Sequence, residues 1–241
     1  MSSYHWSSQN ANGTAMGRYL TEVESRFLLS TCGARGWPAR VLDVGGGDGR
    51  FARLLAARGS TVLVLERDSL PLRELTASGW NAPVVMADGV KLPFQPSSFD
   101  VVLAMEVAQV TDVNHLPHFL QETRRVLGDG GVLIFTSENP RSWGGVMARV
   151  RPSYYGYDGY RYYSTSIGDV QRELAVNGFE AIEVRGFRWP PFSRESKSPW
   201  ISRAAIMERL LGLHRLPGFS PWVYWVAQRR HGASLPNRRS A

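Results

Sequence analysis

The chain has 241 residues, a size that a single sheet-based domain often reaches, and 43% of them are hydrophobic while 20% are charged. These proportions are typical of a globular protein, and no apolar stretch approaches the roughly 18 uninterrupted residues of a membrane-spanning helix. Cys32 is the only cysteine, which excludes an intrachain disulfide, and the N-terminal residues lack the basic start and apolar core of a secretory signal. We therefore expect a cytoplasmic protein.

The positive charge of the chain is concentrated near its C-terminus. Residues 185–241 contain 11 of the 28 Lys+Arg and 2 of the 21 Asp+Glu, whereas residues 1–184 carry a small net negative charge. Only Lys91 and Lys197 are lysines, so the basic charge is almost entirely arginine. Arginine binds phosphates and carboxylates, but an arginine preference is also typical of a GC-rich genome.

Apolar runs and helical periodicities alternate along the chain. Short continuous apolar runs indicate strands buried on both faces, and glycine or serine at the boundaries indicates turns and helix ends. The predicted elements, in chain order, are an amphipathic helix at 14–30, strand 39–44, helix 50–59, strand 60–66, helix 69–79, strands 81–88 and 98–106, helix 112–128, strand 130–138, helix 166–178, strand 179–189, helix 201–213 and strand 220–230.

This alternation predicts an α/β fold with a Rossmann-like, doubly wound, mostly parallel sheet of seven strands and helices on both faces. The last two strands are compatible with a final antiparallel pair. We expect a helical cap at 1–38, one domain at 39–230 that includes insertions at 139–165 and 190–219, and a disordered tail at 231–241.

The clearest chemical signal is the segment VLDVGGGDGRFARLL at 41–55. A buried strand leads into a glycine turn and then a helix, so backbone can approach a ligand closely beside the free N–H groups of a helix N-terminus. A dinucleotide fingerprint needs a third glycine where Arg50 stands, which disfavours an NAD site. The pattern is instead an acid followed by glycines at alternate positions, namely Asp43, Gly45, Gly47 and Gly49.

That pattern resembles motif I of the class I S-adenosylmethionine-dependent methyltransferases, in which the acid and the glycine backbone hold the amino-acid end of the cofactor. The cofactor carries an ammonium and a sulfonium but no pyrophosphate, which suits an acid at a strand end. Acids after the second and third strands follow in the family's order, and SFDVVLAMEV and RRVLGDGGVLIF resemble its later motifs. The resemblance covers residues 39–138.

The resemblance implies a site for S-adenosylmethionine. Glu66 would accept the ribose hydroxyls, and Asp88 with Gly89 would bind the adenine. Arg67 either lies over the adenine or is an exposed turn residue, and Glu106 contacts cofactor or substrate. Arg18 and Tyr19 either cap the carboxylate and the sulfonium or belong to an ordinary amphipathic helix. The implied cofactor residues are Asp43, Gly45, Gly46, Gly47, Gly49, Glu66, Arg67, Asp88, Gly89, Glu106, Arg18 and Tyr19.

Within the class, the chain is most similar to the small-molecule group that includes the ubiquinone-biosynthesis methyltransferases. LPF…SFD, RVL-x-x-GG and AVNGFEAIEVRGFRW carry this similarity. Quinone O-methyltransferases tend to have an acid–acid–His cluster after strand four. Here Glu106 is kept, but Gln109 and Val110 replace the second acid and the histidine. We therefore expect no metal site, and a quinone substrate is in doubt.

A nucleic-acid substrate is not expected. Base C5-methyltransferases need a cysteine nucleophile, and Cys32 precedes the first strand. Exocyclic-amine methyltransferases need an Asn/Asp-Pro-Pro-aromatic motif after strand four, where this chain has MEVAQV. The basic C-terminal region then forms a solvated face, or contacts an acidic substrate or a membrane surface.

Acceptor contacts are expected from segments that surround the common core. The candidates in the tyrosine-rich segment and after strand four are Tyr154, Tyr155, Tyr160, Tyr163 and Gln109, and the tyrosines form either a lid over the substrate or a packed loop. For helix 201–213 we favour core packing over a roof above the pocket or a membrane contact. His115 and His118 are candidate bases, but no base is assigned.

These observations predict S-adenosylmethionine-dependent methyl transfer to a small molecule, with oxygen favoured over nitrogen or carbon as the acceptor atom. Two alternatives stay open. One is a non-catalytic scaffold that only binds the cofactor. The other is an RNA methyltransferase that uses the basic C-terminal region. The oligomeric state is left open.

Overall fold

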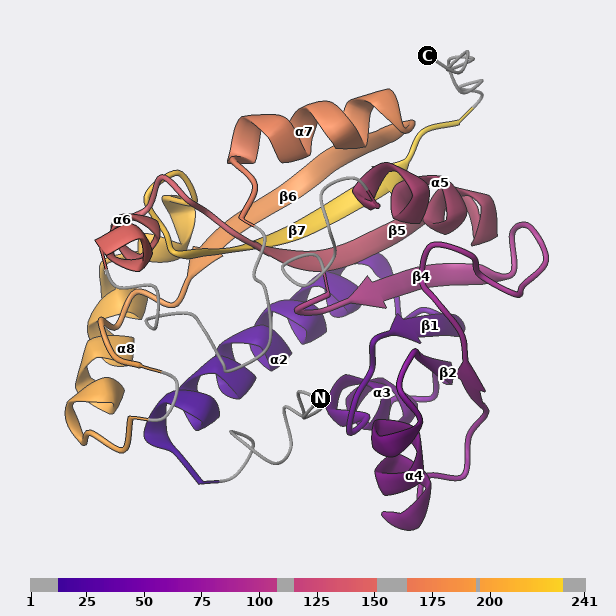
Figure 1. The fold of residues 1–241 in the computed structure, drawn as a ribbon, viewed down its shortest axis with the longest axis horizontal. Helices are drawn as coiled ribbons and strands as arrows, with labels where there is room; N and C mark the ends of the chain where they lie inside the picture. Colours follow the sequence, from indigo (N-terminus) through magenta and orange to yellow (C-terminus); the bar gives the residue numbers. More distant parts are fainter. Residues whose placement is uncertain (1–12, 108–114, 151–163, 194–195, 232–241) are drawn as a thin grey trace.

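The computed structural model describes residues 13–107, 115–150, 164–193 and 196–231, which form a sheet with helices on both faces (Figure 1). The strands are β1 (Arg40–Val44), β2 (Thr61–Glu66), β3 (Val84–Met86), β4 (Phe99–Ala104), β5 (Leu127–Glu138), β6 (Phe179–Phe187) and β7 (Trp222–Arg229). The helices are α2 (Ala15–Arg35), α3 (Arg50–Ala56), α4 (Ser69–Ala77), α5 (Leu116–Val126), α6 (Trp143–Val150), α7 (Ile167–Val176) and α8 (Trp200–Leu210), followed by the 3₁₀ turn η2 (Leu213–Arg215).

The seven strands lie in the order β3-β2-β1-β4-β5-β7-β6. Strands β1 to β5 run parallel, and β7 runs antiparallel to both β5 and β6. The predicted Rossmann-like sheet with a final antiparallel strand is therefore confirmed. The strand order reverses between β1 and β4, and the carboxyl ends of strands at such a point are where open α/β sheets bind ligands.

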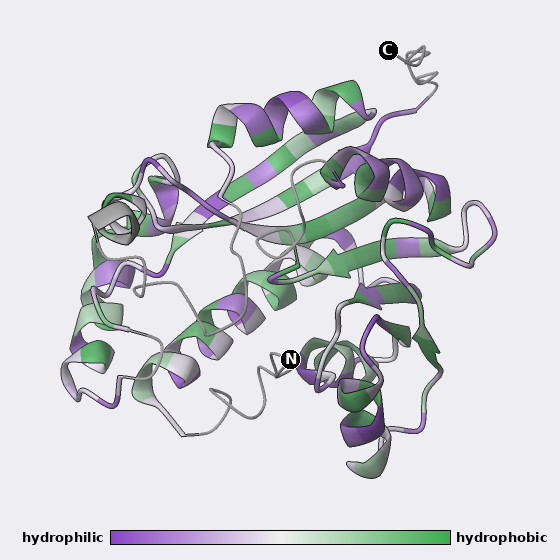
Figure 2. Ribbon diagram, in the orientation of Figure 1, coloured by the Kyte–Doolittle hydropathy of each residue, from purple (hydrophilic) through white to green (hydrophobic). Residues whose placement is uncertain are grey.

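Two apolar cores cover the two faces of the sheet, because successive strand residues point to opposite sides. Val41 of β1 belongs to the core under α2 and α3, whereas its neighbour Leu42 belongs to the core under α5 and α7. Figure 2 shows the corresponding pattern, with hydrophobic strands in the middle and mixed polarity on the outer helices. The strands thus hold a rigid edge against which loops can position ligand-binding groups.

Helix α2 packs directly on the sheet. Thr14 caps its N-terminus by accepting a hydrogen bond from the Gly17 N–H at 2.9 Å, and it ends at Gly36, whose φ is 83°. Its buried residues share a core with β1, β4, β5 and β7. The helix continues beyond the predicted end at residue 30, because Thr31 and Cys32 are also buried.

Other boundaries differ from the predicted ones for local reasons. Helix α6 occupies part of a segment in which no regular element was expected. Strand β4 ends at Ala104 rather than at 106, because the chain turns at 105–107. Strand β5 starts at Leu127, directly after α5. The predicted domain division stays a prediction, and residues 232–241 of the predicted tail lie outside the described residues. Among the described helices, none has both the length and the hydropathy needed to cross a membrane.

Candidate functional site

The glycine turn between β1 and α3 depends on backbone conformations that favour glycine. The φ angles of Gly45, Gly47 and Gly49 are 66°, 53° and 75°. The Gly45 N–H donates to the Leu65 carbonyl at 2.7 Å, so the turn crosses the end of β2. Gly49 is the N-cap of α3. The turn is therefore held between two parallel strands and the start of a helix.

Gly45 and Gly49 are packed tightly against neighbouring side chains, whereas Gly47 between them is open. A Cβ on Gly45 would lie 2.6 Å from a methyl group of Val107, and one on Gly49 would lie 2.5 Å from a methyl group of Leu75. At Gly47, by contrast, a Cβ would meet nothing within 4 Å. The backbone at Gly47 is therefore the part of the turn that a ligand can approach.

Asp43 lies beneath this turn on β1. It is 1% exposed, and a Cβ on Gly46 would lie 3.0 Å from its Oδ2. That oxygen has no hydrogen-bond partner among the described residues. Burial raises the pKa of Asp43 to about 7, although the nearby Arg50 opposes the rise. A buried carboxylate oxygen without a hydrogen bond is costly, and at a glycine turn such an oxygen is a candidate contact for a cationic ligand.

Glu66 joins the end of β2 to the glycine turn. Its Oε1 accepts the Arg67 N–H at 2.8 Å, and its Oε2 accepts the Gly47 N–H at 3.4 Å. The Arg67 side chain is largely exposed and lies 3.9 Å from an oxygen of Asp68. Arg67 is therefore placed as a turn residue, and its contact with the cofactor stays a prediction.

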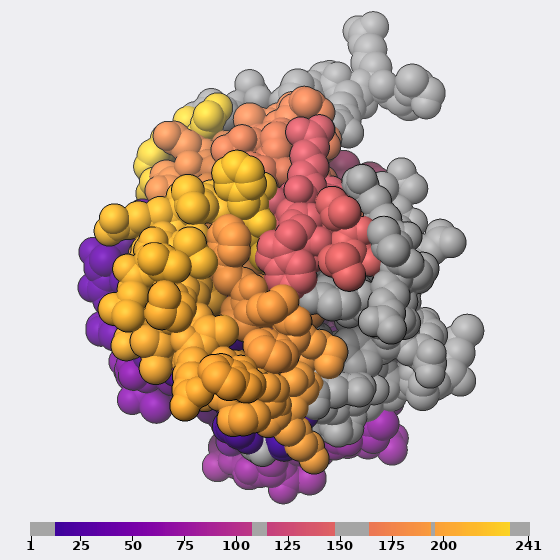
Figure 3. Space-filling model, turned by 90° about the vertical axis from the view of Figure 1, so that its left-hand side faces the viewer, coloured from indigo at the N-terminus to yellow at the C-terminus, as the bar shows by residue number. Residues whose placement is uncertain are grey.

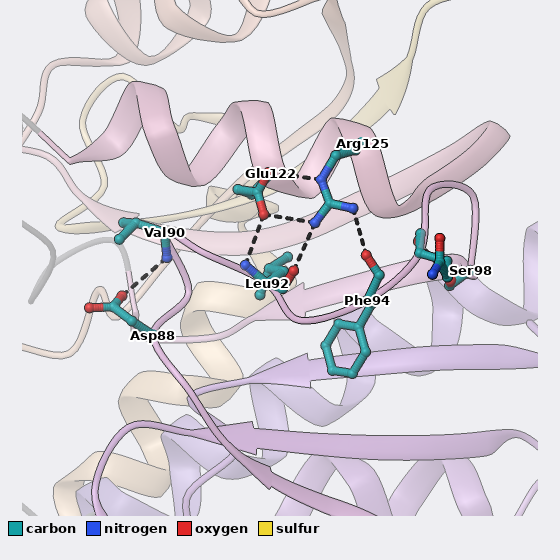
Figure 4. Close-up of polar contacts among 8 residues, drawn as sticks. Asp88, Val90, Leu92, Phe94, Ser98, Glu122 and Arg125 are labelled. Carbon is teal, nitrogen blue, oxygen red and sulfur yellow. Dashed lines mark hydrogen bonds and ion pairs between the residues drawn. The ribbon is translucent and has the colours of Figure 1, made fainter.

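Asp88 and Gly89 follow β3 at the same edge of the sheet (Figure 4). An Asp88 carboxylate oxygen accepts the Val90 N–H at 3.1 Å, and the side chain is exposed. A Cβ on Gly89 would lie 3.1 Å from Val44, the last residue of β1. Because β1, β2 and β3 are parallel, the structure brings Asp43, Glu66 and Asp88 to one edge of the sheet.

Two side chains of α5 fix the loop that follows Asp88. Glu122 accepts the Leu92 N–H at 2.8 Å, while Arg125 donates to the carbonyls of Leu92 at 2.8 Å and Phe94 at 2.6 Å. The two side chains also bind each other at 2.8 Å, and Figure 4 shows both reaching down from the helix to the loop. The Arg125 guanidinium holds the pKa of Glu122 below its usual range. This pair fixes the position of the loop that follows Asp88.

We expect Arg125→Ala to lower the free energy of unfolding by about 2 kcal/mol, because several charge-assisted hydrogen bonds to partly buried groups are lost. The matched control is Arg172→Ala on α7, which also removes an i,i+3 pair with an acid but one that is well exposed. It should change stability by less than about 0.5 kcal/mol. Urea denaturation followed by circular dichroism measures both, and equal losses would show that the loop contacts contribute nothing.

Glu106 lies just beyond β4 in a strained backbone conformation, with a φ of 62°. Its N–H donates to the Thr136 hydroxyl of β5 at 2.8 Å. Its carboxylate lies 3.1 Å from a nitrogen of Arg50, which also lies 3.0 Å from an oxygen of the buried Glu24. Arg50 donates further to the Thr21 hydroxyl at 3.2 Å. The guanidinium thus ties α2, α3 and the end of β4 together around the glycine turn.

The sequence shows Arg50 only as a misfit to a dinucleotide fingerprint, and its role as a bridge was missed. Glu24 is 26 positions away on a separate helix, and Glu106 is 56 positions away on the other side. The only indication of this bridge in the sequence is Glu24, a charged residue on the side of α2 that its apolar residues turn towards the core. Such a residue needs a partner, but the pattern does not say which.

Helix α2 carries two predicted cofactor residues, which differ in their exposure to solvent. Arg18 is exposed, whereas Tyr19 is buried between α2 and α8. The Tyr19 hydroxyl donates to Glu208 and accepts the Arg188 N–H at 3.1 Å. None of the contacts found for the described residues joins Tyr19 to the glycine turn. Contact of either residue with the cofactor therefore stays a prediction.

The residues predicted to contact the acceptor all lie outside the described residues. They are Tyr154, Tyr155, Tyr160, Tyr163 and Gln109. His115 and His118 are both exposed at the start of α5, the helix that follows β4. Cys32 is buried within α2, and burial raises the pKa of its thiol to about 11. This thiol is therefore neither accessible nor ionised near neutral pH.

Comparisons with known proteins agree with this geometry. The family model described as a methyltransferase domain matches residues 42–135. The ubiquinone/menaquinone biosynthesis C-methyltransferase of Laribacter hongkongensis is 36% identical over 129 residues, which are 48% of this chain and 49% of that protein. The biotin biosynthesis bifunctional protein BioHC of Cellvibrio japonicus is 27% identical over 188 residues, which are 74% and 34% of the two proteins. The chain thus spans between a third and a half of the length of these relatives.

Among solved structures, the magnesium protoporphyrin IX methyltransferase of Synechocystis, with bound S-adenosylhomocysteine, is similar to this chain with a TM-score of 0.62. The match covers 89% of this chain and 84% of that one at 15% identity. At that identity the likeness concerns the fold alone.

Proposed function

We propose that this chain transfers a methyl group from S-adenosylmethionine to a small-molecule acceptor, because residues 42–135 match a methyltransferase-domain model and a related region belongs to a ubiquinone/menaquinone biosynthesis methyltransferase. The observation that carries the proposal is a buried carboxylate oxygen of Asp43 that has no hydrogen bond among the described residues and lies under Gly46, next to the open position at Gly47. Arg50 offsets only part of the cost of burying this carboxylate, and an ammonium ligand would supply further counter-charge.

The described residues fit the rest of the cofactor in chemical type. The backbone at Gly47 is open to the methionine portion, Glu66 is an acceptor for the ribose hydroxyls, and Asp88 is an exposed acceptor for the adenine amino group. When bound, the cofactor supplies an electrophilic methyl group on a sulfonium. The protein's task is then to align the acceptor and exclude water, because a displacement of this kind depends on orientation.

We further propose that the acceptor atom is an oxygen. The buried thiol of Cys32 is unsuited to the covalent mechanism of methylation at C5 of a nucleic-acid base, which would need an accessible thiolate. An acceptor hydroxyl must lose a proton, and His115 and His118 offer imidazoles at the helix that follows β4. The relatives are named for biotin biosynthesis and for ubiquinone/menaquinone biosynthesis, which supports a small molecule as the acceptor class.

The test is calorimetric titration of S-adenosylmethionine into the wild type, Asp43→Asn and Asp100→Asn. The wild type should bind, and Asp43→Asn should bind at least tenfold more weakly, because the carboxylate charge is lost. Asp100 is the control, since it lies on β4 but pairs with Arg40 near the surface. Folded wild-type protein that binds no cofactor would overturn the proposal.

Turnover is tested with a ¹³C-methyl donor and a panel of small hydroxyl, amine and carbon acceptors. The chemical shift of the transferred methyl group distinguishes methyl on oxygen from methyl on nitrogen or carbon. A hydroxyl product is expected. Cofactor binding without any product, including with RNA, would point to a binding protein, and an N- or C-methyl product would overturn the choice of oxygen.

A further inference from the structure

Helix α8 buries the side chains of Ile201 and Glu208 but leaves most of its large apolar side chains exposed. Its inner face carries Glu208, which is 6% exposed and accepts a hydrogen bond from the Tyr19 hydroxyl of α2. Its outer face carries large apolar side chains that are between 49% and 72% exposed, namely Trp200, Ile206, Met207, Leu210 and Leu211. A helix that only packs on a core buries such residues, so the outer face has another role.

The exposed apolar surface continues into the segment after α8. Leu216 and Phe219, which flank the turn before β7, are 47% and 68% exposed. We call these two residues and the five apolar residues above the α8 apolar face. Figure 3 shows α8 and this following segment beside each other on one exposed side of the molecule. Contiguous apolar surfaces of this kind mark interaction sites.

Arginines surround the α8 apolar face. Arg203 lies over the Trp200 ring at 4.5 Å, while Arg209 and Arg215 follow along the same segment. A groove of about 440 Å³ separates α8 from α2, and its lining adds Arg18 and Arg26. The two acids in that lining, Glu22 and Glu208, are bound by Arg26 and by Tyr19 respectively. The surroundings of the face are therefore strongly basic.

We propose that the α8 apolar face binds the surface of an anionic lipid bilayer. Apolar side chains of a helix lying in the interface enter the acyl region, while arginines at its border bind the phosphates. Trp200 suits the boundary between the two regions. The anchoring of Glu208 by Tyr19 fixes the rotation of α8, so the apolar side remains directed outward.

The same charges argue against a second copy of the chain on this face. A symmetric contact would bring Arg203, Arg209 and Arg215 of one protomer towards the same arginines of the other. Like charges facing each other across an interface are unfavourable. An anionic bilayer removes this repulsion and also accepts the apolar side chains.

The experiment is sedimentation with vesicles of phosphatidylcholine alone and of phosphatidylcholine mixed in equal parts with phosphatidylglycerol. The wild type should bind the anionic vesicles at least tenfold more tightly than the neutral ones, and salt should weaken this binding. Leu210→Glu/Leu211→Glu should bind the anionic vesicles at least tenfold more weakly than the wild type. Leu70→Glu is the matched control, because Leu70 is also an exposed leucine of a helix, α4.

Circular dichroism shows whether each variant is folded, and the cofactor titration on the same samples keeps this test separate from that of methyl transfer. If the wild-type protein does not bind anionic vesicles, the proposal is overturned. Equal binding by the wild type and the Leu210→Glu/Leu211→Glu variant would also overturn it. A dimer in solution that this variant dissociates, without vesicle binding by the wild type, would assign the face to a second copy instead.

Discussion

Replacing Arg50 with methionine is expected to lower the free energy of unfolding by about 3–5 kcal/mol, because the change leaves two buried carboxylates without their shared counter-charge. The Glu24 side chain is fully buried, and that of Glu106 is 12% exposed. Methionine keeps an apolar stem of similar length, so the loss reports on charge rather than on packing. The measurement is urea denaturation of the ligand-free protein, followed by circular dichroism.

A second substitution separates the loss of the counter-charge from a general loss of structure. In the Arg50→Met background, Glu24→Gln should restore part of the lost stability, because it removes one of the two carboxylate charges that Arg50 balances in the wild type. In the wild type, the same substitution should destabilise, because it removes one partner of a buried pair. Arg73→Met on the exposed side of α4 is the control and should be close to neutral. A loss below about 1 kcal/mol for Arg50→Met would contradict the bridge.

The sheet and the main site residues could be predicted because they depend on short stretches of sequence. A buried parallel strand is a continuous apolar run, and β1, β2, β4 and β5 each contain one. The left-handed conformations of Gly45, Gly47 and Gly49 follow a pattern that is local to one turn. The parallel arrangement then places Asp43, Glu66 and Asp88 at one edge.

The contacts that hold this edge in place could not be predicted, because they join distant parts of the chain. The bridge from Arg50 to Glu24 and the bond from Tyr19 to Glu208 each connect separate elements through packing. Helix α6 was missed because its glycines and its exposed Val146 and Met147 give a weak helical pattern.

The orientation of α8 shows a further limit of sequence patterns. The spacing of apolar residues predicts an amphipathic helix at 201–213, for which core packing was the favoured role. In the structure Ile201 does pack in the core, but Glu208 is turned inward beside it and Leu210 is turned outward. The period of a helix identifies its faces, but the buried partner of Glu208 decides which face lies against the protein. That partner, Tyr19, belongs to a helix almost 190 positions away.

Asp43→Asn is expected to stabilise the protein relative to the wild type as the pH rises, even though it should weaken cofactor binding. Burial raises the pKa of Asp43 from 3.8 to about 7, so the folded protein holds a proton that the unfolded chain releases. Folding therefore gains stability from this group below about pH 4 and loses it as the pH rises towards 7. Asparagine stays neutral throughout and has no such dependence.

The size of the effect follows from the shift in pKa. A difference of about three pH units between the folded and unfolded states corresponds to about 4 kcal/mol, of which about 3 kcal/mol falls between pH 5 and pH 8. The difference in unfolding free energy between Asp43→Asn and the wild type should move by that amount in favour of the variant. Glu208, whose pKa burial also raises to about 7, is present in both proteins and cancels in the comparison.

Denaturation of both proteins at pH 5, 6, 7 and 8 in the absence of cofactor gives this difference directly. A constant difference across the series would mean that Asp43 is already ionised at pH 5, and the argument for a cationic ligand at its oxygen would lose its basis. A difference that grows with pH would show that Asp43 is protonated in the folded protein at pH 5. If this difference disappears when saturating S-adenosylmethionine is added, the cofactor interacts with the ionised carboxylate. The cofactor would then provide the counter-charge for Asp43, so the instability of this carboxylate in the ligand-free protein would be a consequence of its role in binding.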